Sequence, residues 1–310
     1  MPRRAVIDIG TNSVKLLVAD VAGHQVEPAY EAAEQTRLGR GFYETHELQT
    51  EAVAATAQAV ARFAAEAGKL GATPPRIFAT SAARDAKNPE VLLAAIESAC
   101  GLSVEIISGE QEAEWAFRGV ASDARLGSQP LLLLDVGGGS TEFILGQGEH
   151  KHFRQSFPLG SVRLMEALAH SDPPTALERT ATQRWLGDFL KTNVEPQLEL
   201  ALARERCAGN LLLVGTGGTA GILAAMELGL TQYDRGRIDG AVLSAARVSH
   251  WANHLWSLPL AERRKIPGLP PARADVMLTG AAIYDAVMRQ LKFPELRTTA
   301  RGLRYAALME

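Results

Sequence analysis

The chain has 310 residues, 46% of them hydrophobic and 22% charged, with a formal net charge of −3 at pH 7. This balance is typical of a globular protein of about two domains and excludes disordered and fibrous classes. No apolar segment is long enough to span a membrane, and the small negative charge argues against a nucleic-acid binder. Cys100 and Cys207 are too few for a disulfide framework or a four-ligand zinc site. The N-terminus lacks a secretory signal, so we expect a cytoplasmic protein.

An internal repeat opens both halves of the chain. Residues 6–18 read VIDIGTNSVKLLV and residues 133–145 read LLDVGGGSTEFIL, and they align without a gap. Asp8 then falls on Asp135, and Ser13 falls on Ser140. Each copy has an apolar strand, an acidic residue, a polar turn and a second apolar strand, which predicts a β-hairpin. A repeat at this domain-sized spacing indicates a duplicated domain.

The rest of the first half alternates between predicted strands and helices. Pro89 is suited to the first turn of a helix, and Ser108 with Gln111 has the spacing of a helix-capping box. Strands are predicted at 26–32, 76–79 and 104–107, and helices at 52–68, 89–99 and 108–121. Residues 123–130, which contain Gly, Ser and Pro, are interpreted as the boundary between domains at 1–124 and 125–301.

The second half repeats this alternation after its hairpin. A further strand is predicted at 151–157, a long amphipathic stretch at 175–203, a strand and then a helix within 211–226, and helices at 244–256 and 273–291. Strands and helices that alternate in both halves predict an α/β fold.

The two Asp-x-Gly turns are candidate phosphate-binding sites. A turn rich in Gly, Ser and Thr can point several backbone N–H groups into one concavity, where they bind phosphate oxygens. The aspartate at the strand end can hold a hydrated divalent cation. Two copies suggest two walls of one cleft that face the same phosphate chain. The alternative interpretation is a pair of ordinary tight hairpin turns.

A third Gly-rich turn, VGTGGTA at 214–220, follows an apolar run and fits the G-x-G-x-x-A pattern of dinucleotide-binding proteins. That interpretation needs an acidic residue at the end of a second strand. Asp234 stands at about the right distance but within the polar stretch QYDRGRID, so a dinucleotide-binding dehydrogenase is disfavoured. The G-x-x-x-x-G-K-[ST] motif is absent, which excludes P-loop chemistry.

Two side chains outside the turns are further candidates. Glu112 lies in an acidic group at a helix start, where acids often only stabilise the helix dipole, but it could also face a ligand as a base. Arg84 follows a strand and a turn of small residues, and arginine is suited to bidentate phosphate contact. His250 and His254 are spaced i, i+4 without the glutamate of a zinc-protease motif, and are interpreted as helix-surface residues.

Together these segments resemble the exopolyphosphatase/guanosine pentaphosphate phosphohydrolase (Ppx/GppA) family of the acetate kinase–sugar kinase–Hsp70–actin superfamily. The resemblance covers nearly the whole chain, and the chain looks like the two-domain short form. It is carried by IDIGTNSVKLLVAD (7–20), FATSAARDAKN (78–88), VEIISGEQEAEWAFRGV (104–120), LLDVGGGSTEFILG (133–146), FPLGSVRL (157–164), LLVGTGGTAGILA (212–224), LPPARADVMLTGAAIYDAVM (269–288) and RGLRYAAL (301–308).

The resemblance implies two ribonuclease-H-like domains around a central cleft, with the final helix, 302–310, packed back on the first domain. It implies that Glu112 is the catalytic glutamate, that Arg84 contacts phosphate, and that Asp8, Asp135 and Glu142 bind Mg²⁺, with Mn²⁺ as the alternative. The implied phosphate-binding residues are Thr11, Asn12, Ser13, Gly137, Gly138, Gly139, Ser140, Thr141, Gly215, Thr216, Gly217 and Gly218.

The activity expected from this resemblance is metal-dependent release of terminal phosphate from inorganic polyphosphate, with guanosine pentaphosphate (pppGpp) as the alternative substrate. The resemblance leaves the oligomeric state open, with a homodimer as one possibility. Two other functions are disfavoured. A kinase of the same superfamily would need an acceptor pocket, which no sequence feature indicates. A non-catalytic sensor of polyphosphate or an alarmone would not need the water-activating carboxylate of Glu112.

Overall fold

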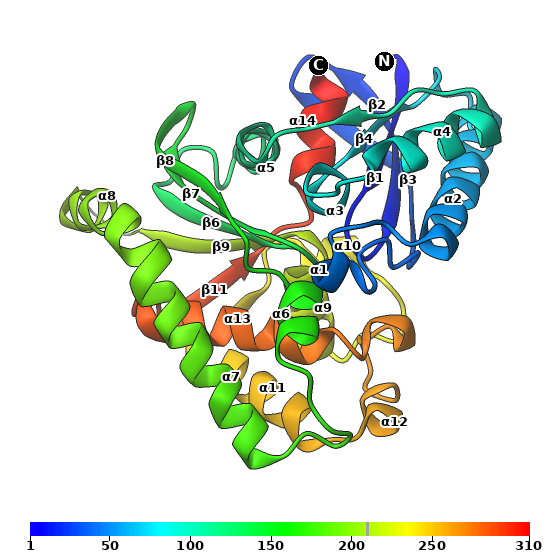
Figure 1. The fold of residues 1–310 in the computed structure, drawn as a ribbon. Coiled ribbons are helices and arrows are strands. Elements are labelled where there is room, and N and C mark those ends of the chain that lie inside the picture. Colours follow the sequence, from blue (N-terminus) through cyan, green and yellow to red (C-terminus); the bar gives the residue numbers. More distant parts are fainter. Residues whose placement is uncertain (209–210) are drawn as a thin grey trace. The chain divides into compact units, whose positions relative to one another are not determined.

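The computed structural model describes residues 1–208 and 211–310, and its contacts divide the chain into two compact units (Figure 1). Unit 1 contains Met1–Ser122 together with Gly302–Glu310, and unit 2 contains Asp123–Arg301. Each unit is built on one mixed sheet with helices around it, so the predicted α/β class is confirmed. None of the described helices combines the length and apolar character that a membrane crossing requires.

Unit 1 has a five-stranded sheet in the order β3-β2-β1-β4-β5. Its first three strands are antiparallel, and β4 and β5 add parallel strands beside β1. The elements are β1 (Arg3–Ile9), β2 (Val14–Ala22), β3 (Gln25–Glu34), α1 (Phe42–Thr45), α2 (Thr50–Lys69), β4 (Arg76–Ala79), α3 (Ser81–Arg84), α4 (Pro89–Cys100), β5 (Glu105–Ile106), α5 (Gly109–Ala121) and α14 (Leu303–Met309).

Both faces of this first sheet are buried, because successive side chains on a strand point to opposite faces. On β1, Ile7 packs into the cluster formed with α2 and α4, whereas Val6 packs into the cluster that contains Trp115 of α5 and Tyr305 of α14. The C-terminal helix α14 therefore completes the core of unit 1 beside α5 (Figure 1).

Unit 2 has a six-stranded sheet in the order β10-β11-β9-β6-β7-β8, with an antiparallel β6-β7-β8 part and β9 parallel to β6. The elements are β6 (Leu131–Val136), β7 (Thr141–Gln147), β8 (His150–Phe157), α6 (Ser161–Ala167), α7 (Ala176–Phe189), a π-helical turn (Leu190–Val194), α8 (Glu195–Ala208), β9 (Leu212–Thr216), α9 (Gly217–Glu227), α10 (Arg235–Ile238), β10 (Val242–Ser244), α11 (Ala245–Ser257), α12 (Leu260–Arg263), a 3₁₀ turn (Pro271–Arg273), α13 (Met277–Gln290) and β11 (Glu295–Thr298).

The structure confirms both predicted hairpins, and most predicted elements end within a few residues of their expected bounds. The helix expected from 273 is different: a 3₁₀ turn occupies Pro271–Arg273, and α13 begins only at Met277. The short strands β10 and β11 were not predicted. Cys100 is a free thiol, whereas the side chain of Cys207 lies outside the described part of the structure.

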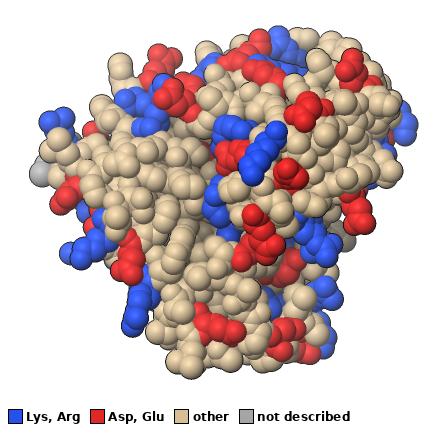
Figure 2. All heavy atoms as spheres, viewed as in Figure 1, with Lys and Arg blue, Asp and Glu red and all other residues tan. Residues whose placement is uncertain are grey.

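Charged side chains of both signs are interspersed over the face of the molecule shown in Figure 2, rather than gathered into one basic surface. Such a mixed surface agrees with the small net charge of the chain.

Candidate functional site

The two repeat hairpins have the same geometry. Ile9 pairs with Val14 in the first hairpin, and Val136 pairs with Thr141 in the second, so both turns contain four residues. The N–H of the first turn residue donates to the carbonyl of the last in each copy, at 3.0 Å from Gly10 to Ser13 and at 2.9 Å from Gly137 to Ser140. The sequence repeat is thus a structural repeat, residue for residue.

The first turn is buried and held by a backbone segment that follows β3. The carbonyl of Thr11 accepts from the N–H of Gly39 at 2.7 Å, and the carbonyl of Asn12 accepts from the N–H of Arg37 at 3.1 Å. Thr11, Asn12 and Ser13 are only 3%, 7% and 3% exposed. The Nδ2 group of Asn12 is buried and has no hydrogen-bond partner in the described part of the chain. A buried donor of this kind is costly unless a ligand accepts from it.

The second turn is held by the start of α6. The N–H of Ser161 donates to the Gly137 carbonyl at 2.9 Å, and the N–H of Val162 donates to the Gly138 carbonyl at 2.8 Å. In a trans peptide the C=O and the following N–H point in opposite directions. The Gly139 carbonyl likewise accepts from Nε of Arg163 on α6. The N–H groups of Gly138, Gly139 and Ser140 therefore point away from α6, and over residues 1–208 and 211–310 they donate to no acceptor. Successive amides turned to one side form an anion-binding concavity.

The third Gly-rich turn lies beside the second within unit 2. Asp135 at the end of β6 pairs in register with Thr216 at the end of the parallel strand β9, so both turns emerge at one edge of the sheet. Gly217 has a φ of +79°, and a Cβ added to it would lie 2.2 Å from Oδ1 of Asp135. The hydroxyl of Thr219 donates to the Val136 carbonyl at 2.7 Å and ties the two turns together. Gly137–Thr141 and Gly215–Gly218 are thus brought together by parallel strands.

Two of the predicted phosphate-binding residues donate their hydroxyl protons inside the fold. The hydroxyl of Thr141 donates to the Leu159 carbonyl, and that of Thr216 donates to the Arg301 carbonyl.

The dinucleotide alternative is wrong, because Asp234 caps α10 by accepting from the N–H of Arg237 and does not end a strand.

Both hairpins carry an aspartate at the end of the first strand, but the residue opposite this aspartate differs between them. In the first hairpin Asp8 faces Lys15, and their charged atoms are 3.8 Å apart. In the second hairpin Asp135 faces Glu142, which is 1% exposed and accepts from the hydroxyl of Ser156 at 2.7 Å. Like charges directly opposite on neighbouring strands repel each other, and a cation bound there removes that cost. The described residues contain no group of three or more His, Cys, Asp or Glu arranged for a metal, so these two carboxylates would be completed by water or substrate oxygens.

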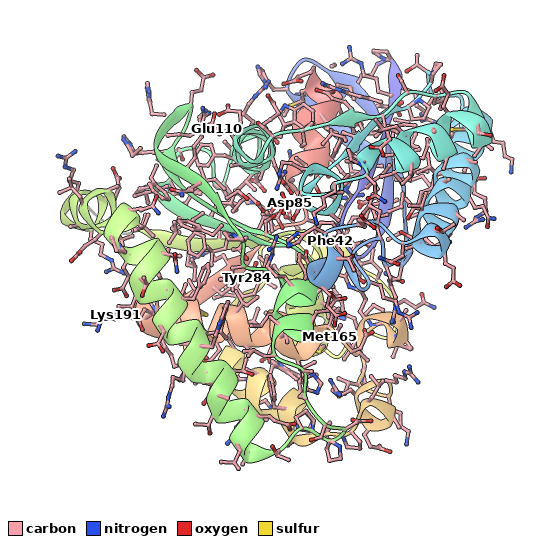
Figure 3. All side chains as sticks on the ribbon, in the orientation of Figure 1. Phe42, Asp85, Glu110, Met165, Lys191 and Tyr284 are labelled. Atoms are coloured by element: carbon pink, nitrogen blue, oxygen red, sulfur yellow. The ribbon has the colours of Figure 1, made fainter. Side chains whose placement is uncertain are left out.

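Glu112 and Arg84 form an ion pair in unit 1. Ser108 caps α5 by accepting from the N–H of Gln111, which places Glu112 in the first turn of the helix, where it is 8% exposed. Nη1 of Arg84 lies 2.8 Å from Oε2 of Glu112 and donates to the Ile107 carbonyl at 3.2 Å. Asp85, labelled in Figure 3, directly follows α3, and its Oδ1 is 3.7 Å from Nε of Arg84. The structure thus brings together the two candidates that the sequence placed on separate segments.

Sequence reasoning missed two further polar residues near the turns of unit 2. The half-buried guanidinium of Arg273 lies over the third turn, with Nη2 2.6 Å from the position of a Cβ on Gly218. Burial lowers the pKa of Arg273, and the charge of Asp275 opposes this shift. Tyr284 of α13, labelled in Figure 3, donates its hydroxyl proton to the Leu134 carbonyl at 3.2 Å. Burial, with the nearby charge of Asp135, raises the pKa of Tyr284 well above 10.0, so this hydroxyl stays protonated. No local sequence signal links either residue to a turn so distant along the chain.

Each unit has three antiparallel strands that are extended by parallel strands, and the same kind of polar turn occurs in both. This architecture defines a duplicated ribonuclease-H-like protein of the actin-like superfamily. Residues 17–310 match the family model described as the Ppx/GppA phosphatase family. The chain therefore belongs to the Ppx/GppA phosphatase family and is a hydrolase, as the sequence resemblance predicted.

Similar proteins agree with this assignment. The chain is 34% identical over 305 residues to exopolyphosphatase 2 of Mycobacterium tuberculosis, covering 94% of this chain and 92% of that protein. It is 29% identical to a guanosine-5'-triphosphate,3'-diphosphate pyrophosphatase of Photobacterium profundum, covering 100% of this chain and 59% of that protein. Among solved structures, the Ppx/GppA enzyme of Aquifex aeolicus has a TM-score of 0.77 at 30% identity, with 99% of each chain covered.

Proposed function

We propose that this protein is a metal-dependent phosphoanhydride hydrolase that releases terminal orthophosphate from inorganic polyphosphate. The observation that carries the proposal is the second hairpin turn, whose three outward N–H groups suit the oxygens of a phosphate chain. The relative named exopolyphosphatase 2 supports polyphosphate as the substrate, since the similarity extends over 94% of this chain.

Phosphoryl transfer depends on positioning and on neutralising charge, because the protein has little covalent chemistry to perform. We assign this neutralisation to the turn amides and to the guanidinium of Arg84, each acting on oxygens of the substrate. The buried Nδ2 of Asn12 supplies a further donor. Arg84 also fixes the carboxylate of Glu112 at 2.8 Å, which holds that side chain in one orientation.

Glu112 is proposed as the general base that orients a water molecule and accepts its proton. Its carboxylate is buried at the start of α5 and anchored by a charged hydrogen bond, as a positioned base must be. A positioned general base typically increases the rate of the reaction by about 10²–10⁴-fold.

Asp135 and Glu142 suit Mg²⁺, because hard cations prefer carboxylate oxygens and Mg²⁺ is commonly held by one or two carboxylates with water and phosphate completing its shell. When bound, the ion supplies positive charge against the leaving phosphate oxygens. Asp8 is also proposed as a ligand, although its carboxylate already faces Lys15 at 3.8 Å.

The second candidate substrate is pppGpp, which the similarity to the Photobacterium profundum pyrophosphatase favours. The test is phosphate release from polyphosphate, pppGpp and ATP measured side by side with Mg²⁺. We expect polyphosphate to be preferred. A pppGpp rate well above the polyphosphate rate would reverse the order, and no release from any of the three would refute the proposal.

A further inference from the structure

The carbonyl groups of the second turn are all occupied, and one of them is bound by a side chain. The backbone of α6 supplies donors to Gly137 and Gly138, the latter from Val162 at 2.8 Å and from Arg163 at 3.0 Å. The Gly139 carbonyl instead accepts from Nε of Arg163 at 2.8 Å.

The close approach of α6 to the turn depends on the residue that precedes the helix. A Cβ on Gly160 would lie 2.3 Å from the Gly138 carbonyl oxygen and 2.5 Å from the Gly139 carbonyl carbon. Glycine is therefore needed at this position for the first turn of α6 to sit against the hairpin turn. At the other end of this contact, the hydroxyl of Thr279 donates to the Ser161 carbonyl at 2.7 Å and fixes α6 to α13.

Arg163 binds the peptide group between Gly139 and Ser140 through its carbonyl oxygen. Three consecutive glycines have wide backbone freedom, so each peptide plane needs an external contact to keep one orientation. Gly137 and Gly138 have such contacts from backbone amides, whereas the Gly139 carbonyl depends on the guanidinium. If this peptide rotated, a carbonyl oxygen would replace the Ser140 N–H in the anion-binding concavity and would repel phosphate.

We propose that Arg163 is a positioning residue for substrate phosphate: its Nε–H holds the Gly139 carbonyl so that the Ser140 N–H faces the ligand. This inference rests on the proposed function, and it assigns to Arg163 an action through the backbone rather than a contact with substrate. The first turn shows the contrast, because the carbonyls of Thr11 and Asn12 are held by the backbone N–H groups of Gly39 and Arg37, and the three residues that follow Gly10 are stiffer than glycine.

The experiment compares Arg163→Met, Arg163→Lys and Arg163→Ala with the matched control Arg184→Met, an exposed arginine on α7 of the same unit. Two readouts are used for each variant: kcat/KM for phosphate release from polyphosphate, and calorimetric affinity for tripolyphosphate. The melting temperature is measured alongside. Lysine keeps the charge but places a methylene where the arginine Nε–H stands, so it separates the hydrogen bond from the charge.

We expect Met and Lys at position 163 to lower kcat/KM and tripolyphosphate affinity by roughly 10–100-fold, the range for losing a hydrogen bond from a charged donor, with an unchanged melting temperature. Millimolar guanidinium should restore part of the activity of Arg163→Ala and none in the control. Near-normal values for Arg163→Lys would overturn the proposal, as would a lower melting temperature with unchanged kinetic constants. If the wild type binds tripolyphosphate but releases no phosphate, the proposed function fails, and the affinities still decide the role of Arg163.

Discussion

The two hairpin turns share a backbone and differ in chemistry. The first is built from Gly10, Thr11, Asn12 and Ser13, and the side chain opposite its aspartate is the cation Lys15. The second is built from three glycines and a serine, and the side chain opposite its aspartate is the carboxylate Glu142. In unit 1 the aspartate beside the turn thus faces a positive charge, whereas in unit 2 two carboxylates face each other beside the turn. The comparison teaches that the same strand pairing supports two different electrostatic environments, of which the one in unit 2 suits the proposed metal ion.

The units also differ in what surrounds their turns. Unit 1 holds the Glu112–Arg84 pair, whereas unit 2 holds a second Gly-rich turn against Asp135. We therefore propose a division of roles, with water activation by Glu112 in unit 1 and cation binding by Asp135 and Glu142 in unit 2. Four predictions test how the two units differ in stability and in chemistry, and they are ordered by expected effect.

Deletion of residues 302–310 should have the largest effect and should act on unit 1. Leu303, Tyr305 and Leu308 are buried there beside β1 and α5, and each large apolar side chain contributes roughly 1.5–3 kcal/mol when buried. We expect amide hydrogen exchange to accelerate in β1 and β2, with β6 and β7 of unit 2 retaining their protection. Unchanged exchange in unit 1, or an unchanged melting temperature, would show that α14 is dispensable.

Substitution of Glu112 by Gln should lower kcat by about 10²–10⁴-fold, because the amide keeps the shape of the side chain but cannot accept a proton from water. Tripolyphosphate should still bind, and excess Mg²⁺ should not restore the rate, since no ligand of the ion has been removed. The control is Glu110→Gln, on an exposed residue of the same helix turn, which should be near normal. A rate restored by added Mg²⁺ would mean that the roles of the two units are reversed.

Substitution of Glu142 by Gln should weaken Mg²⁺ binding by at least about 10-fold. A loss of this size is typical when a residue that only supports the ligands of a metal is removed. The Mg²⁺ concentration for half-maximal rate should rise, excess Mg²⁺ should partly restore activity, and Asp135→Asn should behave in the same way. Glu149→Gln, on an exposed residue of unit 2, is the matched control. An unaltered Mg²⁺ dependence in both site variants would remove the metal from this hairpin.

The smallest expected effect is a pH dependence of the stability of unit 1. Burial raises the pKa of Glu310, but hydrogen bonds from Arg76, Trp115 and Arg118 outweigh it, so the pKa lies below the ordinary 4.5. A carboxyl group whose pKa is lower in the folded state than in the unfolded state stabilises the fold at pH values above its unfolded-state pKa. This contribution is lost as the pH falls through the folded-state pKa.

The melting temperature should therefore fall on acidification below about pH 4.5, and Glu310→Gln should flatten that part of the curve. The counterpart in unit 2 is Glu178, whose pKa is lowered to about 2 by hydrogen bonds from Thr175 and Ser171. Glu178→Gln should alter acid sensitivity in unit 2 and leave β1 and β2 of unit 1 unaffected. Identical acid curves for wild type and Glu310→Gln would show that the carboxylate contributes no stability.

The sequence by itself determined the local features of this protein. Apolar strands around an Asp-x-Gly turn predicted both hairpins, which the pairing of Ile9 with Val14 and of Val136 with Thr141 confirms. These features depend on periodicity and on turn residues, which act over a few positions. The motifs taken together also predicted the family.

Only the tertiary structure decided which distant groups meet at each turn. Sheet order placed Thr216 beside Asp135, inserted β11 between β9 and β10, and brought Arg163, Arg273 and Tyr284 to the turns of unit 2. Such contacts follow from strand order and helix packing, which pair residues far apart in the chain, and no local pattern of side chains encodes that pairing.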